Sequence, residues 1–233
     1  MFFLFDIDDT LYDLEIPFRV AFKDMFKYEP DDIHEIFLDF RKYNNLIYEK
    51  ALLGEITMDE MCIYRAKEAF KDHGITVDDS EAMEFQITYL KDKNCITLDP
   101  YIEKSLQLLK KNNIPIGIIS NGPSKDQIEK VEFLDLFKYV KLENIFISED
   151  IGAFKPEPAI FNYAREKMGI SEGDEAYFVG DSFELDIIGS SNAGFKTIWV
   201  NRRNYKENRD FKKPDFTAYT FKEVYEIIAG LVR

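Results

Sequence analysis

The amino-acid sequence predicts an α/β fold: a doubly wound, Rossmann-like parallel sheet with a bundle of helices inserted into it. From about residue 95 onward, short apolar runs alternate with helical patterns. This alternation is typical of parallel strands joined by right-handed helical crossovers. Residues 14–94 show helical periodicity only. We therefore expect a core domain made of residues 1–13 and 95–233, and a helical cap domain, residues 14–94, inserted after the first strand.

The first predicted strand covers residues 2–5, an unbroken apolar run typical of strands buried on both faces of a sheet. It is followed by closely spaced carboxylates: Asp6, Asp8, Asp9 and Asp13. Alternation along an extended chain places Asp6 and Asp8 on the same side, at the strand end where ligands of such sheets bind. A divalent cation would offset the cost of burying them. The alternative is an acidic turn after the strand, with Asp9 or Thr10 starting a helix. We expect Asp9 and Asp13 to be structural, with Asp13 capping or tightening the turn that leads into the inserted segment.

The inserted segment has the pattern of a helical bundle. Its apolar residues recur at every fourth position, as expected of a stripe that faces a core: Phe18, Phe22 and Phe26. Thr57 and Glu60 form a capping box at the start of a helix that Gly74 would end, and a later helix is expected over residues 80–91. An insertion at this edge of the sheet is placed to act as a lid over a site.

The elements after residue 94 follow in regular alternation. Strands are predicted over residues 114–119, 145–148, 176–179 and 196–200, and helices over residues 100–113, 124–136, 157–168, 185–192 and 221–231. A locally basic stretch, residues 202–213, includes Arg202, Arg203, Lys206 and Arg209. We expect a solvated loop there, with a contact to substrate or to a partner subunit as the alternative.

Composition excludes several functional classes. The 233-residue chain has a net charge of −14 and a pI near 4.7, which argue against nucleic-acid partners and anionic membrane surfaces. Cys62 and Cys95 form no recognisable disulfide or metal framework. No stretch approaches the roughly 18 apolar residues of a membrane helix, and no leader pattern opens the chain. We expect a soluble, cytoplasmic protein, as a monomer or small homo-oligomer.

Polar groups suited to phosphate chemistry follow the predicted strands at one edge of the sheet. Successive strand ends and loops contribute Asp6 and Asp8, then Ser120 and Asn121, then Lys155, and finally Asp181 and Asp186. Hydroxyl and backbone amide groups hold anion oxygens, and carboxylates are the oxygen ligands that Mg²⁺ prefers. The combination therefore predicts a site for a phosphate group together with Mg²⁺.

The sequence resembles a known family. The segments F-D-I-D-D-T-L, I-I-S-N-G, F-K-P and G-D-S-F-E-L-D occur in the order and approximate spacing of the motifs of the haloacid dehalogenase-like (HAD) superfamily. The resemblance covers the whole chain, because the helical segment falls where members of that superfamily carry a first-type cap. Each motif is weak alone, but the complete set at successive strand ends is specific.

The resemblance implies catalytic roles. Asp6 is similar to the nucleophile that forms an aspartyl-phosphate. Asp8 is similar to the general acid that protonates the leaving alcohol and then, as a base, activates water. Ser120 and the Asn121 amide would bind the phosphoryl oxygens, and Lys155 would offset negative charge.

The resemblance also implies a Mg²⁺ site. Its ligands would be the carboxylates of Asp6 and Asp181 and the backbone carbonyl of Asp8. Asp186 would orient water or ligands without binding the ion directly. An anionic nucleophile requires a cation before it can approach an anionic phosphate.

Asp8 distinguishes among the activities of the superfamily. The 2-haloacid dehalogenases lack an acid at this position and need no metal, because a halide leaves without a proton. Asp8 therefore favours phosphatase activity on a small phosphorylated metabolite, such as a nucleoside monophosphate or a sugar phosphate, and the D-x-D-D-T-L-Y start resembles nucleotidases. The alternatives are a phosphohexomutase, which usually has Gly where Asp9 stands, a dehalogenase, and a lysine-dependent phosphonate-cleaving enzyme. Outside the superfamily, a receiver-like phosphoacceptor switch and a non-catalytic binding protein are the other candidates.

Overall fold

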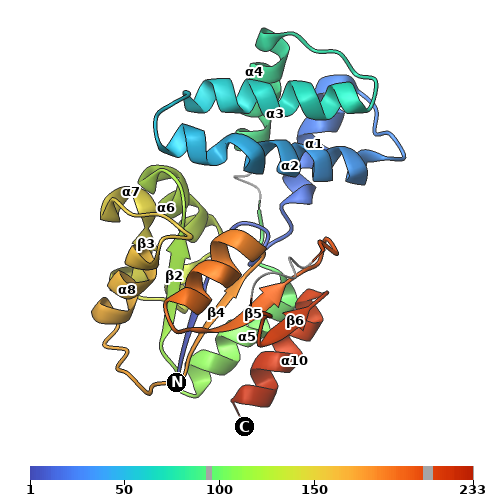
Figure 1. Cartoon of the computed structure of the whole chain (residues 1–233). Helices are drawn as coiled ribbons and strands as arrows, with labels where there is room; N and C mark the ends of the chain where they lie inside the picture. The colour runs from blue at the N-terminus through green and yellow to red at the C-terminus, as the bar shows by residue number, and fades with distance from the viewer. Residues whose placement is uncertain (93–95, 207–211, 233) are drawn as a thin grey trace. The chain divides into compact units, whose positions relative to one another are not determined.

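The computed structural model describes residues 1–92, 96–206 and 212–232 (Figure 1). The chain divides into two compact units, which we call the α/β unit (Met1–Asp13 and Thr97–Arg233) and the helical unit (Leu14–Ile96). The expected boundary at residues 94/95, Cys95 and Arg209 lie outside the described residues.

The α/β unit contains a six-stranded sheet with the order β3-β2-β1-β4-β5-β6, in which every pairing is parallel. The strands are β1 (Phe2–Phe5), β2 (Ile116–Ser120), β3 (Ile145–Ile147), β4 (Ala176–Gly180), β5 (Lys196–Val200) and β6 (Phe216–Ala218). The predicted Rossmann-like fold is confirmed. The chain leaves β1 on one side for β2 and β3 and returns on the other side for β4. Such a reversal opens a crevice at the carboxyl ends of the central strands.

Strand β6 is the one element of the sheet that the sequence did not predict. It has three residues, too few to show periodicity, and it pairs with β5 through Trp199 opposite Thr217. The entry to β6 is fixed by Asp215, whose carboxylate accepts hydrogen bonds from the backbone N–H and the hydroxyl of Thr197 at 2.8 and 3.2 Å. Contacts with another strand, and not local pattern, therefore define this edge.

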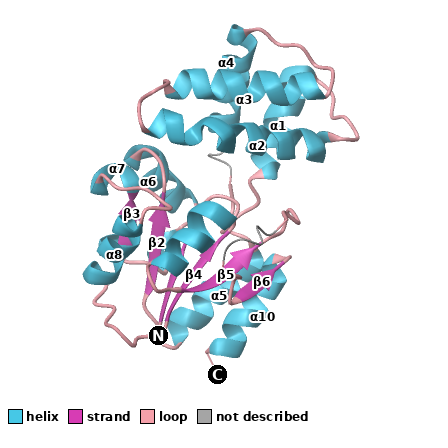
Figure 2. Ribbon diagram, in the orientation of Figure 1, coloured by secondary structure: helices cyan, strands magenta, loops and turns pink. Residues whose placement is uncertain are grey.

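The helices of the α/β unit lie between successive strands, except α10, which follows β6 (Figure 2). They are α5 (Pro100–Lys111), α6 (Ser124–Phe133), α7 (Ser148–Ile151), α8 (Pro158–Lys167), α9 (Gly189–Asn192) and α10 (Phe221–Leu231), with a π-helical turn at Phe183–Ile188 before α9. Helix α5 packs beside α10, and α8 beside α9. Phe161 of α8 packs edge-on against Phe178 of β4, with ring centroids 5.3 Å apart. Apolar packing of this kind makes the sheet a rigid base for the residues at its carboxyl edge.

The helical unit consists of α1 (Glu15–Phe26), α2 (Ile33–Leu52), α3 (Met58–Asp72) and α4 (Asp79–Asp92). Phe18 lies at the centre of its core and contacts the rings of Phe37, Phe40 and Phe85 at 5.1–5.4 Å. The predicted apolar stripe of α1 is therefore core. The predicted capping box is also present, since the Glu60 backbone N–H donates to the Thr57 hydroxyl at 3.1 Å and the Glu60 carboxylate accepts from the Thr57 N–H at 2.8 Å.

Across the part of the chain that the structure describes, no helix combines the length and the apolarity that a bilayer span requires.

Candidate active site

Asp6 is the first residue after β1, and its side chain is buried. Its backbone N–H donates to the carbonyl of Val179 at 2.9 Å, which extends the pairing of β1 with β4 by one residue. One carboxylate oxygen accepts from Lys155 Nζ at 2.6 Å, and the other accepts from the Thr10 hydroxyl at 3.3 Å. Only 6% of Asp6 is exposed, so these contacts hold a carboxylate that is largely removed from water.

Lys155 lies between two carboxylates. Its Nζ atom is 2.6 Å from Asp6 Oδ1 and 2.7 Å from Asp186 Oδ1, and 3% of the residue is exposed. The Asn121 side chain holds the backbone of Lys155 in place. Asn121 Nδ2 donates to the Lys155 carbonyl at 2.9 Å, and its Oδ1 accepts from the Lys155 N–H at 2.8 Å. The structure thus joins the loops after β2 and β3 to the end of β1, as the sequence predicted.

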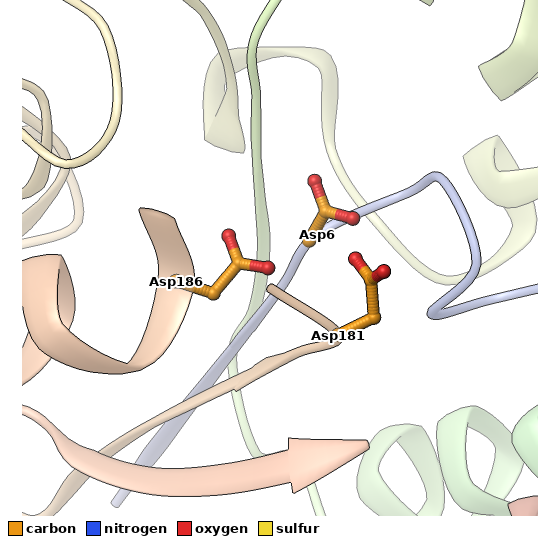
Figure 3. A group of neighbouring side chains, drawn as sticks. All are labelled: Asp6, Asp181 and Asp186. Atoms are coloured by element: carbon orange, nitrogen blue, oxygen red, sulfur yellow. The ribbon is translucent and has the colours of Figure 1, made fainter. Parts of the chain in front are cut away.

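Asp181 and Asp186 come from the segment after β4 and face Asp6 (Figure 3). One oxygen from each of the three carboxylates lies within 4.8 Å of the others. The backbone N–H of Ser182 holds Asp186 by donating to its Oδ2 at 2.9 Å. Gly180 makes this approach possible, because a Cβ atom there would lie 2.5 Å from the Asp186 carboxylate.

The charge balance of this group is negative. Burial raises the pKa of Asp6 to about 6, Lys155 opposes the increase, and the charges of Asp186 and Asp8 add to it. Burial alone would lower the pKa of Lys155, but Asp186 and Asp6 outweigh it and raise that pKa, so the lysine keeps its proton. Lys155 accompanies the three carboxylates of Asp6, Asp181 and Asp186. A set of buried, closely spaced oxygen donors with excess negative charge fits a hard divalent cation such as Mg²⁺.

Ser120 ends β2, the strand beside β1, where Ile118 lies opposite Phe5. It is 1% exposed, and its hydroxyl donates to Gln127 Oε1 at 2.9 Å. Gly122, with φ of +136°, turns the chain away, and its N–H donates to the Ser148 hydroxyl at 3.0 Å. The parallel pairing brings Ser120 to the same sheet edge as Asp6. The sequence-based prediction did not include Gln127 or Ser148, whose contacts depend on the folded loops.

Asp8 lies further out than Asp6, with 25% of its side chain exposed. Its Oδ1 atom accepts a hydrogen bond from the Tyr12 hydroxyl, and its Oδ2 atom accepts from Lys130 Nζ at 2.5 Å. The sequence-based prediction included neither donor. Lys130 lies on α6, which is rich in charged residues, and nothing in the sequence pattern distinguishes it from its exposed neighbours.

The interpretation of residues 202–213 as a solvated loop is wrong for its first two arginines. The side chains of Arg202 and Arg203 are only 13% and 7% exposed, and both bind Asp9 and Asp13. Arg203 contacts both oxygens of Asp9, at 3.0 and 2.8 Å. Their partners follow β1 in the sequence, almost two hundred residues earlier, so no local pattern indicated these pairs. Lys206, Lys212 and Lys213 of the same stretch are exposed.

These pairs give Asp9 and Asp13 the structural role that we expected. Asp9 is 2% exposed and has φ of +60°, a left-handed conformation that Asp tolerates better than most residues. Burial would raise the pKa of Asp13, but hydrogen bonds and charge from Arg202 and Arg203 outweigh it and lower the pKa to about 2. The two arginines thus hold in place the segment that follows Asp8 in the sequence.

Comparison with known proteins agrees with this geometry. A family model for haloacid dehalogenase-like hydrolases matches residues 2–194. The crystal structure of the HAD-hydrolase YfnB from Bacillus subtilis, bound to magnesium, superposes with a TM-score of 0.71 at 25% identity and covers 97% of each chain.

The relatives carry the names of more than one activity. The glyceraldehyde 3-phosphate phosphatase of Pyrococcus furiosus is 28% identical over 239 residues, covering 98% of this chain and 92% of that protein. The pyrimidine 5'-nucleotidase YjjG of Escherichia coli is 36% identical over 118 residues, 51% of each chain. The (S)-2-haloacid dehalogenase of Pseudomonas fluorescens is 26% identical over 204 residues, covering 86% of this chain and 84% of that protein. The family match over residues 2–194, together with the sheet order and the carboxylates at its edge, shows that this chain belongs to the haloacid dehalogenase-like hydrolases.

Proposed function

We propose that this protein is a Mg²⁺-dependent phosphatase that hydrolyses small phosphate monoesters through an aspartyl-phosphate on Asp6. The observation that carries the proposal is Asp8, a second carboxylate two residues beyond Asp6, held by Tyr12 and Lys130 and 25% exposed. A phosphate ester needs a proton donor for its alkoxide leaving group, whereas a halide does not. The phosphatase and nucleotidase relatives support the same conclusion.

The proposed reaction has two steps. First, a carboxylate oxygen of Asp6 attacks phosphorus, the bond from phosphorus to the ester oxygen breaks, and Asp8 gives its proton to the leaving alcohol. Second, Asp8 takes a proton from water, whose oxygen attacks the phosphorus of the aspartyl-phosphate. Inorganic phosphate leaves, and Asp6 returns to its carboxylate form.

Other residues would stabilise the charge that develops on the phosphoryl group. Lys155 is already fixed 2.6 Å from the attacking carboxylate, so it can offset negative charge without reorganisation. We assign the Asn121 backbone N–H and the Ser120 hydroxyl to the phosphoryl oxygens; the hydroxyl would turn from Gln127 Oε1, to which it donates at 2.9 Å, towards the phosphate. The Asn121 side chain is not available for this role, because it holds the backbone of Lys155.

We assign the Mg²⁺ site to the carboxylates of Asp6 and Asp181 and the backbone carbonyl of Asp8, with Asp186 holding Lys155 beside them. A bound Mg²⁺ would neutralise charge shared by the nucleophile and the phosphate. The magnesium in the YfnB crystal structure supports this choice of ion.

The substrate class is a further part of the proposal. We propose small phosphorylated metabolites, either nucleoside monophosphates or sugar or triose phosphates, because relatives with these activities match this chain. We assign selection of the leaving group to the helical unit, as the cap of the family. We also propose that the enzyme acts in the cytoplasm, as a monomer or small homo-oligomer.

A release assay separates the two activities found among the relatives. Purified protein would be incubated with 4-nitrophenyl phosphate, nucleoside monophosphates and sugar phosphates, with Mg²⁺ or with EDTA, and separately with 2-chloropropionate. We expect Mg²⁺-dependent phosphate release and no halide release. Halide release without metal, in the absence of phosphate release, would establish a dehalogenase instead.

Substitution of the nucleophile tests the catalytic assignment. Asp6→Asn should abolish phosphate release, whereas Asp126→Asn, at an exposed position of α6, should not change it. An Asp6→Asn protein as active as the wild type would remove the nucleophile assignment. Stable phosphorylation of Asp6 without turnover would favour a phosphoacceptor switch.

A further inference from the structure

Lys130 is a buried lysine to which the catalytic assignments above give no role of its own. It belongs to α6, and 8% of the residue is exposed. Its Nζ atom is 2.5 Å from Asp8 Oδ2. Lysine is almost never buried without a partner, because its ammonium group loses hydration. Its position inside the α/β unit therefore depends on groups that replace water, and the carboxylate of Asp8 is one of them.

Lys130 also connects Asp8 to the predicted phosphate-binding hydroxyl. Its Nζ atom donates to Gln127 Oε1 at 3.3 Å, and the same oxygen accepts from the Ser120 hydroxyl at 2.9 Å. Gln127 lies three residues before Lys130, so one helical face carries both side chains. A continuous chain of hydrogen bonds thus runs from the acid–base residue at the end of β1 to the residue that ends β2.

The two oxygens of Asp8 are held by one residue that is near in the sequence and one that is distant. Tyr12, four residues later, donates to Oδ1, and Lys130, more than a hundred residues later, donates to Oδ2. A carboxylate with a donor on each oxygen cannot rotate without breaking one of these contacts. An acid–base group is effective only within hydrogen-bond reach of the atom that it protonates, so its orientation is directly relevant to rate.

We propose that Lys130 is a positioning residue that orients Asp8 for proton transfer. The inference rests on the proposed phosphatase activity and extends it to a residue outside the family motifs. It predicts that loss of Lys130 impairs leaving-group protonation specifically. Phosphate esters with poor leaving groups, which depend most on a general acid, should be the most affected.

The experiment compares two esters of similar size with different leaving groups, 4-nitrophenyl phosphate and phenyl phosphate, in the presence of Mg²⁺. Lys130→Met removes the charge and keeps most of the length of the side chain. Lys125→Met removes the charge from an exposed lysine of the same helix and is the matched control. For each protein, the quantity of interest is kcat/KM for phenyl phosphate divided by kcat/KM for 4-nitrophenyl phosphate.

We expect this ratio to fall by about tenfold or more in Lys130→Met, since general acid catalysis is typically worth 10²–10⁴-fold in rate. It should stay at the wild-type value in Lys125→Met. Lys130→Arg, which keeps a cation beside Asp8, should recover most of the ratio. Tyr12→Phe should lower the ratio as Lys130→Met does, and it provides the test if Lys130→Met does not fold.

Two results would overturn the inference while leaving the phosphatase proposal intact. One is an equal loss with both esters, which a merely structural role would cause. The other is a Lys130→Met protein that has the wild-type ratio. Failure of the wild-type protein to hydrolyse either ester with Mg²⁺ is a separate result, which would overturn the proposed function and with it this inference.

Discussion

Arg203 provides a strong test of how the catalytic loop is held. Its guanidinium group binds both oxygens of Asp9 and one oxygen of Asp13, and only 7% of its side chain is exposed. Arg203→Met would remove the charge and leave Asp9, which is 2% exposed, with one fewer donor group. The substitution therefore removes one member of a buried ionic cluster.

The size of the effect follows from burial. Removing one partner of a buried ion pair typically costs about 3–5 kcal/mol, because the remaining charge is left without compensation. Arg202 still binds Asp9 at 2.7 Å and Asp13 at 3.1 Å, so part of the compensation remains. We therefore expect Arg203→Met to lower the free energy of unfolding of the α/β unit by about 2–4 kcal/mol.

The assay is urea denaturation followed by tryptophan fluorescence. Trp199, in β5, is the only tryptophan of the chain and is fully buried, so its emission reports on the α/β unit. Lys222→Met is the control, because Lys222 is 62% exposed and should change stability by no more than about 0.5 kcal/mol. Adding Asp9→Asn to Arg203→Met should recover part of the loss, because it removes the uncompensated charge. Asn also tolerates the left-handed conformation of this position. A loss below about 1 kcal/mol in Arg203→Met would refute the reasoning.

Three further expectations concern the cluster of carboxylates formed by Asp6, Asp181 and Asp186. In metal-free protein, the pKa of Asp6 is raised from an ordinary 3.8 to about 6. The protonated Asp6 side chain therefore makes its full contribution to the free energy of unfolding below pH 3.8, and this contribution is lost as pH rises through 6. Across this range in EDTA, Asp6→Asn should gain stability relative to the wild type. Mg²⁺ at a hundred times its Kd should stabilise the wild type by about 2.7 kcal/mol, and Asp181→Asn should lose most of this gain in thermal unfolding. Gly180→Ala, whose Cβ would meet the Asp186 carboxylate at 2.5 Å, should cost about 1–3 kcal/mol and lower turnover. Gly230→Ala, in α10 with nothing within 4 Å, should leave stability unchanged or raise it by up to about 1 kcal/mol.

Local sequence determined the fold class and most of the candidate site. Each strand of the sheet except β6 shows as a short apolar run, and the side chains that meet at the sheet edge follow these runs directly: Asp6, Ser120, Asp181 and, after a loop, Lys155. Parallel strands bring their carboxyl ends to one edge whatever their separation in sequence. For this reason, residues 149 positions apart, Asp6 and Lys155, could be expected to meet, and they do at 2.6 Å.

The tertiary structure alone decided which residues hold the site in place. Lys130 reaches Asp8 across 122 residues, and Arg203 reaches Asp9 across 194. In the sequence, both basic residues stand in charged stretches that are typical of solvated surfaces. Whether such a side chain stays hydrated or is buried depends on whether the fold places a carboxylate beside it. Hydration and pairing have similar free energies for an exposed charge but very different ones for a buried charge, and burial is a property of the whole structure.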